Sequence, residues 1–147
     1  MKIDHVGILV EKIDEEIIEF FMKNFGCERP RFFKIDTPNK KMRYCHMHIG
    51  DTYIELLEPH EGYWLELVKR KGSGSLVEIC FEVDDIEEFY DRMKAKGITL
   101  VDLDQKPLSE EKKKYCQIPG DDNKLAYLPL NKTFGILIEV LERSAWR

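Results

Sequence analysis

The chain opens with a short apolar run, after which apolar residues recur at helical spacing. Residues 2–10 are mostly apolar and partly β-branched, which predicts a strand. An acidic segment follows, and its apolar side chains recur at steps of three and four residues. They are Ile13, Ile17, Phe20, Phe21 and Phe25. This spacing predicts an amphipathic helix, for which Gly26 is a natural left-handed end.

The same pattern returns in the second half of the chain. Residues 76–83 predict another strand, and Asp84-Asp85 can cap the helix that follows. The apolar stripe of this helix consists of Ile86, Phe89, Tyr90 and Met93. Gly97 closes it, as Gly26 closes the first helix. We infer an internal duplication, since two such units divide the 147 residues almost equally.

Shorter alternating patterns complete each half. In the first half they predict strands at residues 31–35, 42–49 and 52–57, with Gly50-Asp51 as a hairpin turn. In the second half they predict strands at residues 98–103, 125–130 and 136–141, with a polar, lysine-rich loop at 104–123. Each half is therefore predicted as one strand, one helix and three further strands.

The two halves are joined by a distinct segment. Residues 61–71 predict a short linking helix, and residues 72–75 are a flexible Gly-Ser run. We expect an α+β fold with two βαβββ modules, residues 1–60 and 75–147, joined by residues 61–74 into a single domain of residues 1–147. One module leaves a sheet face uncovered, so we expect the two to pack together with a central cleft between their concave sheets.

Composition narrows the classes of partner. Apolar residues are 43% of the chain, charged residues are 35% and the formal net charge is −5, which argues against nucleic acid as the main partner. No apolar run approaches the roughly 18 residues that span a bilayer, and Asp4 and His5 interrupt any secretory pattern at the N-terminus. The widely spaced cysteines predict free thiols and a cytoplasmic location. They are Cys27, Cys45, Cys80 and Cys116.

Equivalent positions of the two halves carry the candidate chemistry. His5 and Glu78 stand at matching places on the opening strands, 73 residues apart (78 − 5 = 73), and Glu55 and Glu139 stand on the last strands. A carboxylate within an apolar strand is costly unless it is paired, hydrogen-bonded or bound to a metal. Pseudo-twofold symmetry would bring one imidazole and three carboxylates to a common divalent ion such as Co²⁺, Mn²⁺, Ni²⁺, Mg²⁺ or Zn²⁺. The oxygen-rich set suits an octahedral ion better than a closed tetrahedral zinc site.

The simpler interpretation is that each glutamate faces water on the polar side of an antiparallel sheet. Around Glu55 both strand faces are apolar, which makes this interpretation less favourable. His46 and His48 share one face of their strand and are alternative ligands or polar residues near the cleft, whereas His60 is expected to be exposed.

Several segments resemble the vicinal-oxygen-chelate superfamily, which includes glyoxalases, bleomycin resistance proteins and dioxygenases. The similar segments are residues 3–8, 50–59, 81–86, 95–97 and 135–139. Within the superfamily the chain is most similar to the methylmalonyl-CoA epimerase group, with glyoxalase I next. The resemblance implies a glyoxalase-like incomplete barrel, a homodimer, and metal ligands at His5, Glu55, position 78 and Glu139.

Two positions depart from the pattern of this superfamily. The superfamily normally has histidine where this chain has Glu78, and a third carboxylate makes a bound ion a weaker Lewis acid. Glu78 is thus a ligand, a base beside a three-ligand metal, or a sign that the metal has been lost. Epimerases also resemble two-base enzymes, and no acidic residue lies between Asn39 and Gly50. The second base would then be Glu78, Glu82 or a histidine.

The resemblance implies a metal-dependent isomerase or lyase that removes a proton next to a carbonyl or thioester and stabilises the enolate. Glu139 is the expected base, with Glu78 as a second catalytic group. The substrate is a small molecule, with an acyl-CoA thioester as one candidate, and the lysines of loop 104–123 could meet its phosphates. The alternatives are a lactoylglutathione lyase of the glyoxalase I type, a non-catalytic resistance-type binder, and an Fe²⁺ dioxygenase. A dioxygenase would need two histidines and one carboxylate as ligands, and Glu78 does not fit that set.

Overall fold

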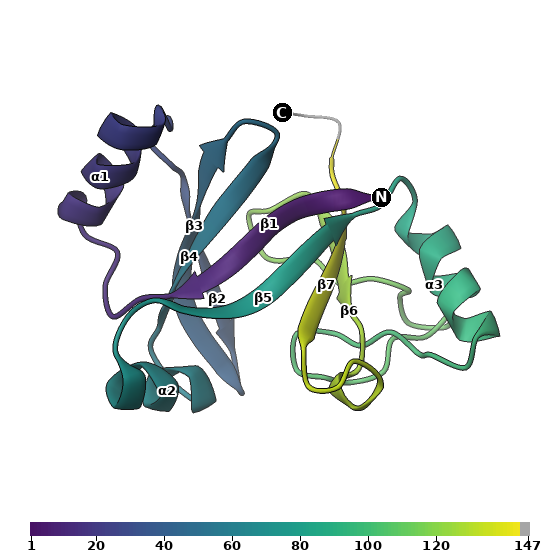
Figure 1. Ribbon diagram of the computed structural model, residues 1–147. Helices are drawn as coiled ribbons and strands as arrows, with labels where there is room; N and C mark the ends of the chain where they lie inside the picture. The colour runs from purple at the N-terminus through teal and green to yellow at the C-terminus, as the bar shows by residue number, and fades with distance from the viewer. Residues whose placement is uncertain (145–147) are drawn as a thin grey trace. The chain divides into compact units, whose positions relative to one another are not determined.

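The computed structural model describes residues 1–144, which divide into two compact units. The N-terminal unit comprises His5–Val77, and the C-terminal unit comprises Met1–Asp4 together with the chain from Glu78 onward. In chain order the elements are β1 (Lys2–Leu9), α1 (Glu15–Phe25), β2 (Phe32–Thr37), β3 (Lys40–Ile49), β4 (Thr52–Pro59), α2 (Tyr63–Lys71), β5 (Ser75–Glu82), α3 (Ile86–Ala95), β6 (Lys124–Tyr127), a 3-10 helix (Leu130–Lys132) and β7 (Leu137–Glu142) (Figure 1).

The sheet of the N-terminal unit has the strand order β2-β3-β4-β1. β3 and β4 form an antiparallel hairpin whose turn is Gly50-Asp51, and β1 runs parallel to β4 on the other side. Gly50 has a φ of 60°, which a side chain would disfavour and which the first turn position of such a hairpin requires. The parallel β1–β4 pair is possible because α1, β2 and β3 supply the long connection between its strands.

Helix α1 covers one face of this sheet. The Asp14 side chain accepts a hydrogen bond from the Ile17 amide at its start, and Gly26 ends it with a φ of 69°. Its buried Ile18 packs in a core cluster with Met47 and Leu56 of the hairpin. Side chains alternate along a strand, so residues next to Met47 and Leu56 in sequence face the opposite side of the sheet from α1.

The sheet of the C-terminal unit has β7 between β5 and β6. β5 and β7 are parallel, as β1 and β4 are, and β6 is antiparallel to β7. The Asp85 carboxylate caps α3 by accepting hydrogen bonds from the Glu87 and Glu88 amides. Ile86 and Phe89 of α3 pack against Val140 of β7, which gives this unit its own core.

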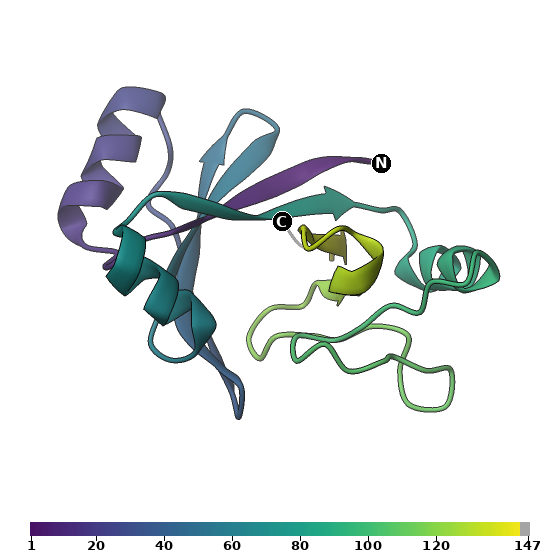
Figure 2. The ribbon, with the colours of Figure 1, turned by 60° about the horizontal axis from the view of Figure 1, so that its bottom comes forward.

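The predicted strand at residues 98–103 is wrong. Only Val101 pairs, through isolated bridges with Tyr127 and Pro107, and the Asp102 carboxylate folds the chain back by accepting from the Asp104 and Lys106 amides. Asx turns of this kind compete with strand pairing. Figure 2 shows the stretch between α3 and β6 as a long loop without a regular strand.

The predicted strand at residues 125–130 is also shorter than expected. β6 ends at Tyr127, and Leu130 begins the 3-10 helix after Pro129. Proline has no amide hydrogen to donate to a sheet, which accounts for the early end. The other predicted helices and strands are present with boundaries shifted by a few residues, and the α+β class is confirmed. Among the described residues, no helix is both long and apolar enough to cross a membrane.

Candidate metal-binding and acid–base residues

His5 and Glu55 meet inside the N-terminal unit. His5 lies on β1 and Glu55 on the adjacent β4, both on the sheet face opposite α1. The Nε2 atom of His5 is 3.0 Å from Oε2 of Glu55, and the two side chains are only 2% and 7% exposed. Gly7 of β1 is the register partner of Glu55, so no side chain from that position competes for the space. His5 and Glu55, the two predicted ligands of the N-terminal unit, therefore lie together and are shielded from solvent.

His46 is a third member of the same group. It is the direct cross-strand partner of Glu55 in the β3–β4 hairpin, and its Nε2 atom is 3.6 Å from Oε1 of Glu55. Its ring centroid lies 5.0 Å from that of His5. One donor atom from each of His5, His46 and Glu55 can be chosen so that all three lie within 4.8 Å of one another. Sequence reasoning gave His46 only as an alternative ligand.

Aromatic neighbours hold the His46 ring in place. The surrounding rings are those of Phe33, Tyr44 and Tyr53, at centroid distances of 6.3, 5.8 and 5.5 Å. These residues come from β2, β3 and β4, so the three strands together define the ring position. The His46 side chain is 12% exposed as a result.

The electrostatics of this group keep Glu55 ionised. Burial acts to raise the pKa of Glu55, but the charges and polar contacts of His5 and His46 outweigh it and hold that pKa well below its usual range. Burial and the Glu55 charge raise the pKa of the neighbouring Cys45 thiol to about 12, so this cysteine remains protonated. The result is a carboxylate flanked by two imidazoles in a largely water-free place.

Glu78 and Glu139 form a second pair inside the C-terminal unit. Glu78 lies on β5 and Glu139 on β7, and they are 4% and 5% exposed. A carboxylate oxygen of one lies within 4.8 Å of a carboxylate oxygen of the other. Two buried carboxylates this close repel each other unless a proton or a cation lies between them.

A thiol and a hydroxyl contact the Glu139 carboxylate. The Cys80 thiol donates to Oε1 of Glu139 across 3.5 Å. The Tyr127 hydroxyl also bonds to Glu139, and burial followed by the charges of Glu139 and Glu78 raises the pKa of Tyr127 well above its ordinary value. The Tyr127 hydroxyl therefore stays protonated, and both donors orient the carboxylate. Tyr127 was not identified from the sequence, although its place opposite Glu139 follows from the last hairpin.

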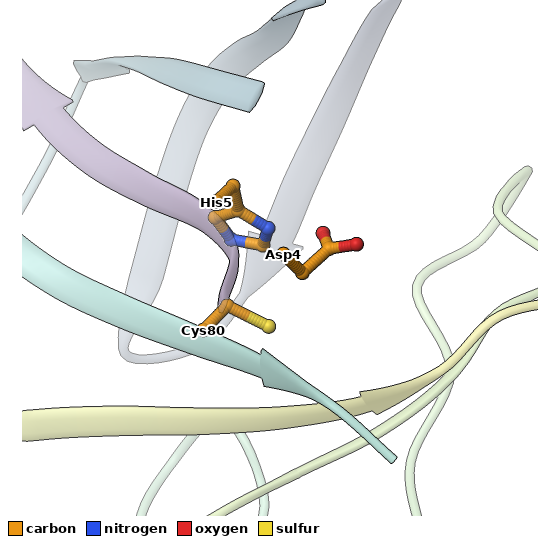
Figure 3. A group of neighbouring side chains, drawn as sticks. All are labelled: Asp4, His5 and Cys80. Atoms are coloured by element: carbon orange, nitrogen blue, oxygen red, sulfur yellow. The ribbon is translucent and has the colours of Figure 1, made fainter. Parts of the chain in front are cut away.

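Asp4 is a further buried acid that the sequence analysis did not single out. Figure 3 shows it on β1, together with Cys80 on β5 of the same unit. Asp4 is 1% exposed and pairs with the guanidinium of Arg143, at the end of β7. The Asp4 charge is therefore compensated within the C-terminal unit, and we assign it to stability.

The remaining histidines lie outside these groups. His48 is exposed on β3 and stacks on Tyr53, with 4.7 Å between the ring centroids. His60 is half-exposed, and its Nε2 atom lies 2.9 Å from Glu58 Oε1. The expectation that His60 is exposed is thus met.

The fold agrees with a comparison of the sequence with known protein families. The chain belongs to the glyoxalase/bleomycin resistance protein/dioxygenase superfamily, whose sequence pattern matches residues 4–116. No curated protein sequence matches the chain significantly.

Solved structures with the same fold include several methylmalonyl-CoA epimerases. The enzyme from Mycobacterium tuberculosis aligns with a TM-score of 0.73 and 18% identity, covering 97% of this chain and 88% of that one. A methylmalonyl-CoA epimerase in complex with methylmalonyl-CoA and NH4⁺ aligns with a TM-score of 0.70 and 20% identity, over 98% and 95% of the two chains. A variant of the Streptomyces coelicolor enzyme in complex with 2-nitronate-propionyl-CoA aligns with a TM-score of 0.70 and 20% identity, covering 99% of this chain and 96% of that one.

Proposed function

We propose that the protein is a metal-dependent isomerase that removes and returns a proton next to a thioester carbonyl, as methylmalonyl-CoA epimerases do. The ligand set we propose is His5, Glu55, Glu78 and Glu139. One observation carries the proposal: each unit buries ionisable side chains at equivalent strand positions. A cation would compensate the charge of these buried groups. These side chains fit a divalent ion, since imidazole nitrogens and carboxylate oxygens are its ordinary ligands.

The bound ion would supply a positive charge that stabilises the enolate oxygen. The residues of the chain do the proton transfer. Glu139 accepts the substrate proton, and the electron pair of the broken C–H bond moves to the thioester oxygen. The Cys80 thiol and the Tyr127 hydroxyl hold this carboxylate in one orientation. Glu78 is the second acid–base group, which returns a proton to the carbon.

An acyl-CoA thioester is the substrate class we propose. The structures with the same fold include complexes with methylmalonyl-CoA and with 2-nitronate-propionyl-CoA. Loop 104–123 offers cations for the phosphates of such a substrate. Lys114 is already bound to Asp91 at 2.8 Å, so Lys106, Lys112 and Lys113 are the better candidates.

Proton exchange is the direct test of this proposal. The protein, loaded with Co²⁺, is incubated in D₂O with methylmalonyl-CoA, and deuterium incorporation at the α-carbon is followed by mass spectrometry. We expect incorporation at a rate that requires the protein and is abolished by EDTA. No incorporation, together with turnover of the methylglyoxal–glutathione adduct, would replace the proposal with the glyoxalase I type of reaction. Tight thioester binding without either reaction would support a non-catalytic binder.

A further inference from the structure

We propose that a surface cleft in the C-terminal unit binds the pantetheine arm of an acyl-CoA substrate. This arm is the chain with two amide groups that joins the thioester sulfur to the phosphates of the nucleotide. The inference rests on the proposed function for the substrate class, and it adds the place on this chain where the arm of that substrate is bound.

The cleft lies between two segments of the C-terminal unit, the loop at residues 97–107 and the turn at residues 129–132. Its volume is about 510 Å³, which lies within the range of roughly 300–1,000 Å³ that is usual for small-molecule sites. Backbone hydrogen bonds of 2.9 Å hold both walls, from the Leu108 amide to the Leu100 carbonyl and from the Lys132 amide to the Pro129 carbonyl. The cleft is therefore formed before any ligand binds.

Strand register places the cleft on the sheet face that carries Glu139. Tyr127 is the cross-strand partner of Glu139, and Val101, which lines the cleft, bridges to Tyr127. Paired residues of neighbouring strands point to the same face, whereas Leu100 and Val140 belong to the core under α3 on the other face. Neighbouring strands are about 4.8 Å apart, so Val101 lies roughly 10 Å from Glu139. An arm that leaves an acyl group at Glu139 thus reaches the cleft along one face of the sheet.

The side chains that line the cleft match the chemistry of the arm. Val101 and Pro107 give it apolar surface for the methyl and methylene groups. The Gln105 and Asn131 side chains also line it, are exposed, and make no hydrogen bond with any described residue. A side-chain amide both donates and accepts, so each of these two can pair with one amide of the arm.

The charge of the cleft suits the phosphates at the end of the arm. Lys132 lines the cleft and makes no ion pair with any other residue among 1–144. Lys106, which is exposed, adjoins the cleft between two residues that line it, Gln105 and Pro107. The described residues that line the cleft include no acidic side chain, so nothing there opposes an anion.

Backbone strain beside the cleft is a separate observation. Gln105 and Phe134 are the non-glycine residues of the described chain with a positive φ, at 62° and 57°. Gln105 lines one wall, and Phe134 follows the segment that forms the other. Such conformations cost free energy and are concentrated at binding and active sites. Oδ1 of Asp102 fixes Gln105 in place by accepting from the amides on either side of it, those of Asp104 and Lys106.

Binding of coenzyme A to the full-length chain tests the inference without any turnover. Titration calorimetry compares the wild type with the double variant Gln105→Gly/Asn131→Ala, and glycine keeps the turn because it adopts a positive φ freely. Each lost hydrogen bond should weaken binding about fivefold, so we expect the Kd of coenzyme A to rise about 25-fold.

The control is Gln117→Ala, which removes an exposed amide of the same long loop outside the cleft. Its Kd for coenzyme A should equal that of the wild type. Unchanged affinity in the double variant, or a wild-type protein that does not bind coenzyme A, would overturn the inference.

Turnover distinguishes a general structural defect from loss of the arm site. Deuterium exchange is compared for methylmalonyl-CoA and for the S-ethyl thioester of methylmalonate, which has no arm. The double variant should lose kcat/KM for methylmalonyl-CoA through a higher KM and keep the wild-type value for the short thioester. Equal losses for the two substrates would contradict the inference. Weaker coenzyme A binding in the double variant, together with no exchange by the wild type, would refute the proposed function and leave the cleft assignment intact.

Discussion

At the scale of single residues, the buried carboxylates are the groups whose removal from water costs the most free energy. Glu55, Glu78 and Glu139 are each at most 6% exposed, and removing an ionised carboxylate from water costs several kcal/mol unless it is compensated. Under the proposed function, all three are kept for metal binding or proton transfer. Their roles as ligand and base remain predictions, which substitutions can separate.

Glu139→Gln tests the base. The amide keeps the shape of the side chain but cannot accept the substrate proton, so we expect deuterium exchange into methylmalonyl-CoA to fall by about 10²–10⁴-fold. The control is Glu87→Gln, on the exposed side of α3. Normal exchange in Glu139→Gln would assign the base to another residue.

The Cys45 and Cys116 thiols make the free energy of unfolding depend on alkaline pH. Burial, and after it the charge of Glu55, raises the pKa of the Cys45 thiol from an ordinary value of 9.0 to about 12. Burial, and after it the charge of Glu139, raises the pKa of the Cys116 thiol from 9.0 to about 12 as well. Folding thus favours the protonated thiols. Their contribution to the free energy of unfolding is fully present below pH 9 and is lost as pH rises from 9 towards 12.

Urea denaturation at pH 8, 9 and 10 should therefore show a falling free energy of unfolding. The expected slope above pH 9 approaches about 1 kcal/mol per pH unit for each thiol. The double variant Cys45→Ala/Cys116→Ala is the comparison, and its curve should be flatter over the same range. Parallel curves for the variant and the wild type would show that these thiols already titrate normally in the folded chain.

At the scale of elements, capping determines where the helices begin. The Asp14 carboxylate satisfies the Ile17 amide at the start of α1. Asp14→Ala should lower the free energy of unfolding by about 1 kcal/mol, as measured by urea denaturation. Asp14→Asn keeps an acceptor oxygen and should lose much less. Equal losses for the two variants would mean that the charge near the helix dipole, and not the cap, stabilises α1.

The pairing of His46 with Glu55 is also decided at this scale, and the sequence contains the signal for it. His46 is the fourth residue before Gly50, and Glu55 is the fourth after Asp51, so a two-residue turn makes them cross-strand partners. Residues 98–103 are the contrary example. Their apolar pattern suits a strand, but the chain forms an Asx turn at Asp102 and only isolated bridges at Val101.

At the scale of the whole molecule, the two ends of the described chain are tied together in the C-terminal unit. Asp4, near the N-terminus, is buried against Arg143 after β7. Arg143→Ala leaves the Asp4 charge buried without compensation and should cost about 3–5 kcal/mol of stability. Thermal and urea denaturation measure this loss.

The double variant Asp4→Asn/Arg143→Met removes both charges and should recover most of the stability lost in Arg143→Ala. Such recovery would show that the cost comes from an unpaired buried charge and not from lost packing of the arginine. A double variant as unstable as Arg143→Ala would contradict the ion-pair explanation. Dimerisation, the cytoplasmic location and the division into residues 1–60, 61–74 and 75–147 stay predictions.

The amino-acid sequence by itself determined the duplicated strand–helix pattern, with one helix ending at Gly26 and the other beginning after Asp85. It also determined that four ionisable residues lie within apolar strands, namely His5, Glu55, Glu78 and Glu139. These features are local consequences of periodicity and capping. Only the tertiary structure decided that His5 joins His46 and Glu55, that Cys80 donates to Glu139, and that Arg143 compensates Asp4. Those contacts join residues far apart in the chain, and strand register and burial, which local spacing does not specify, bring them together.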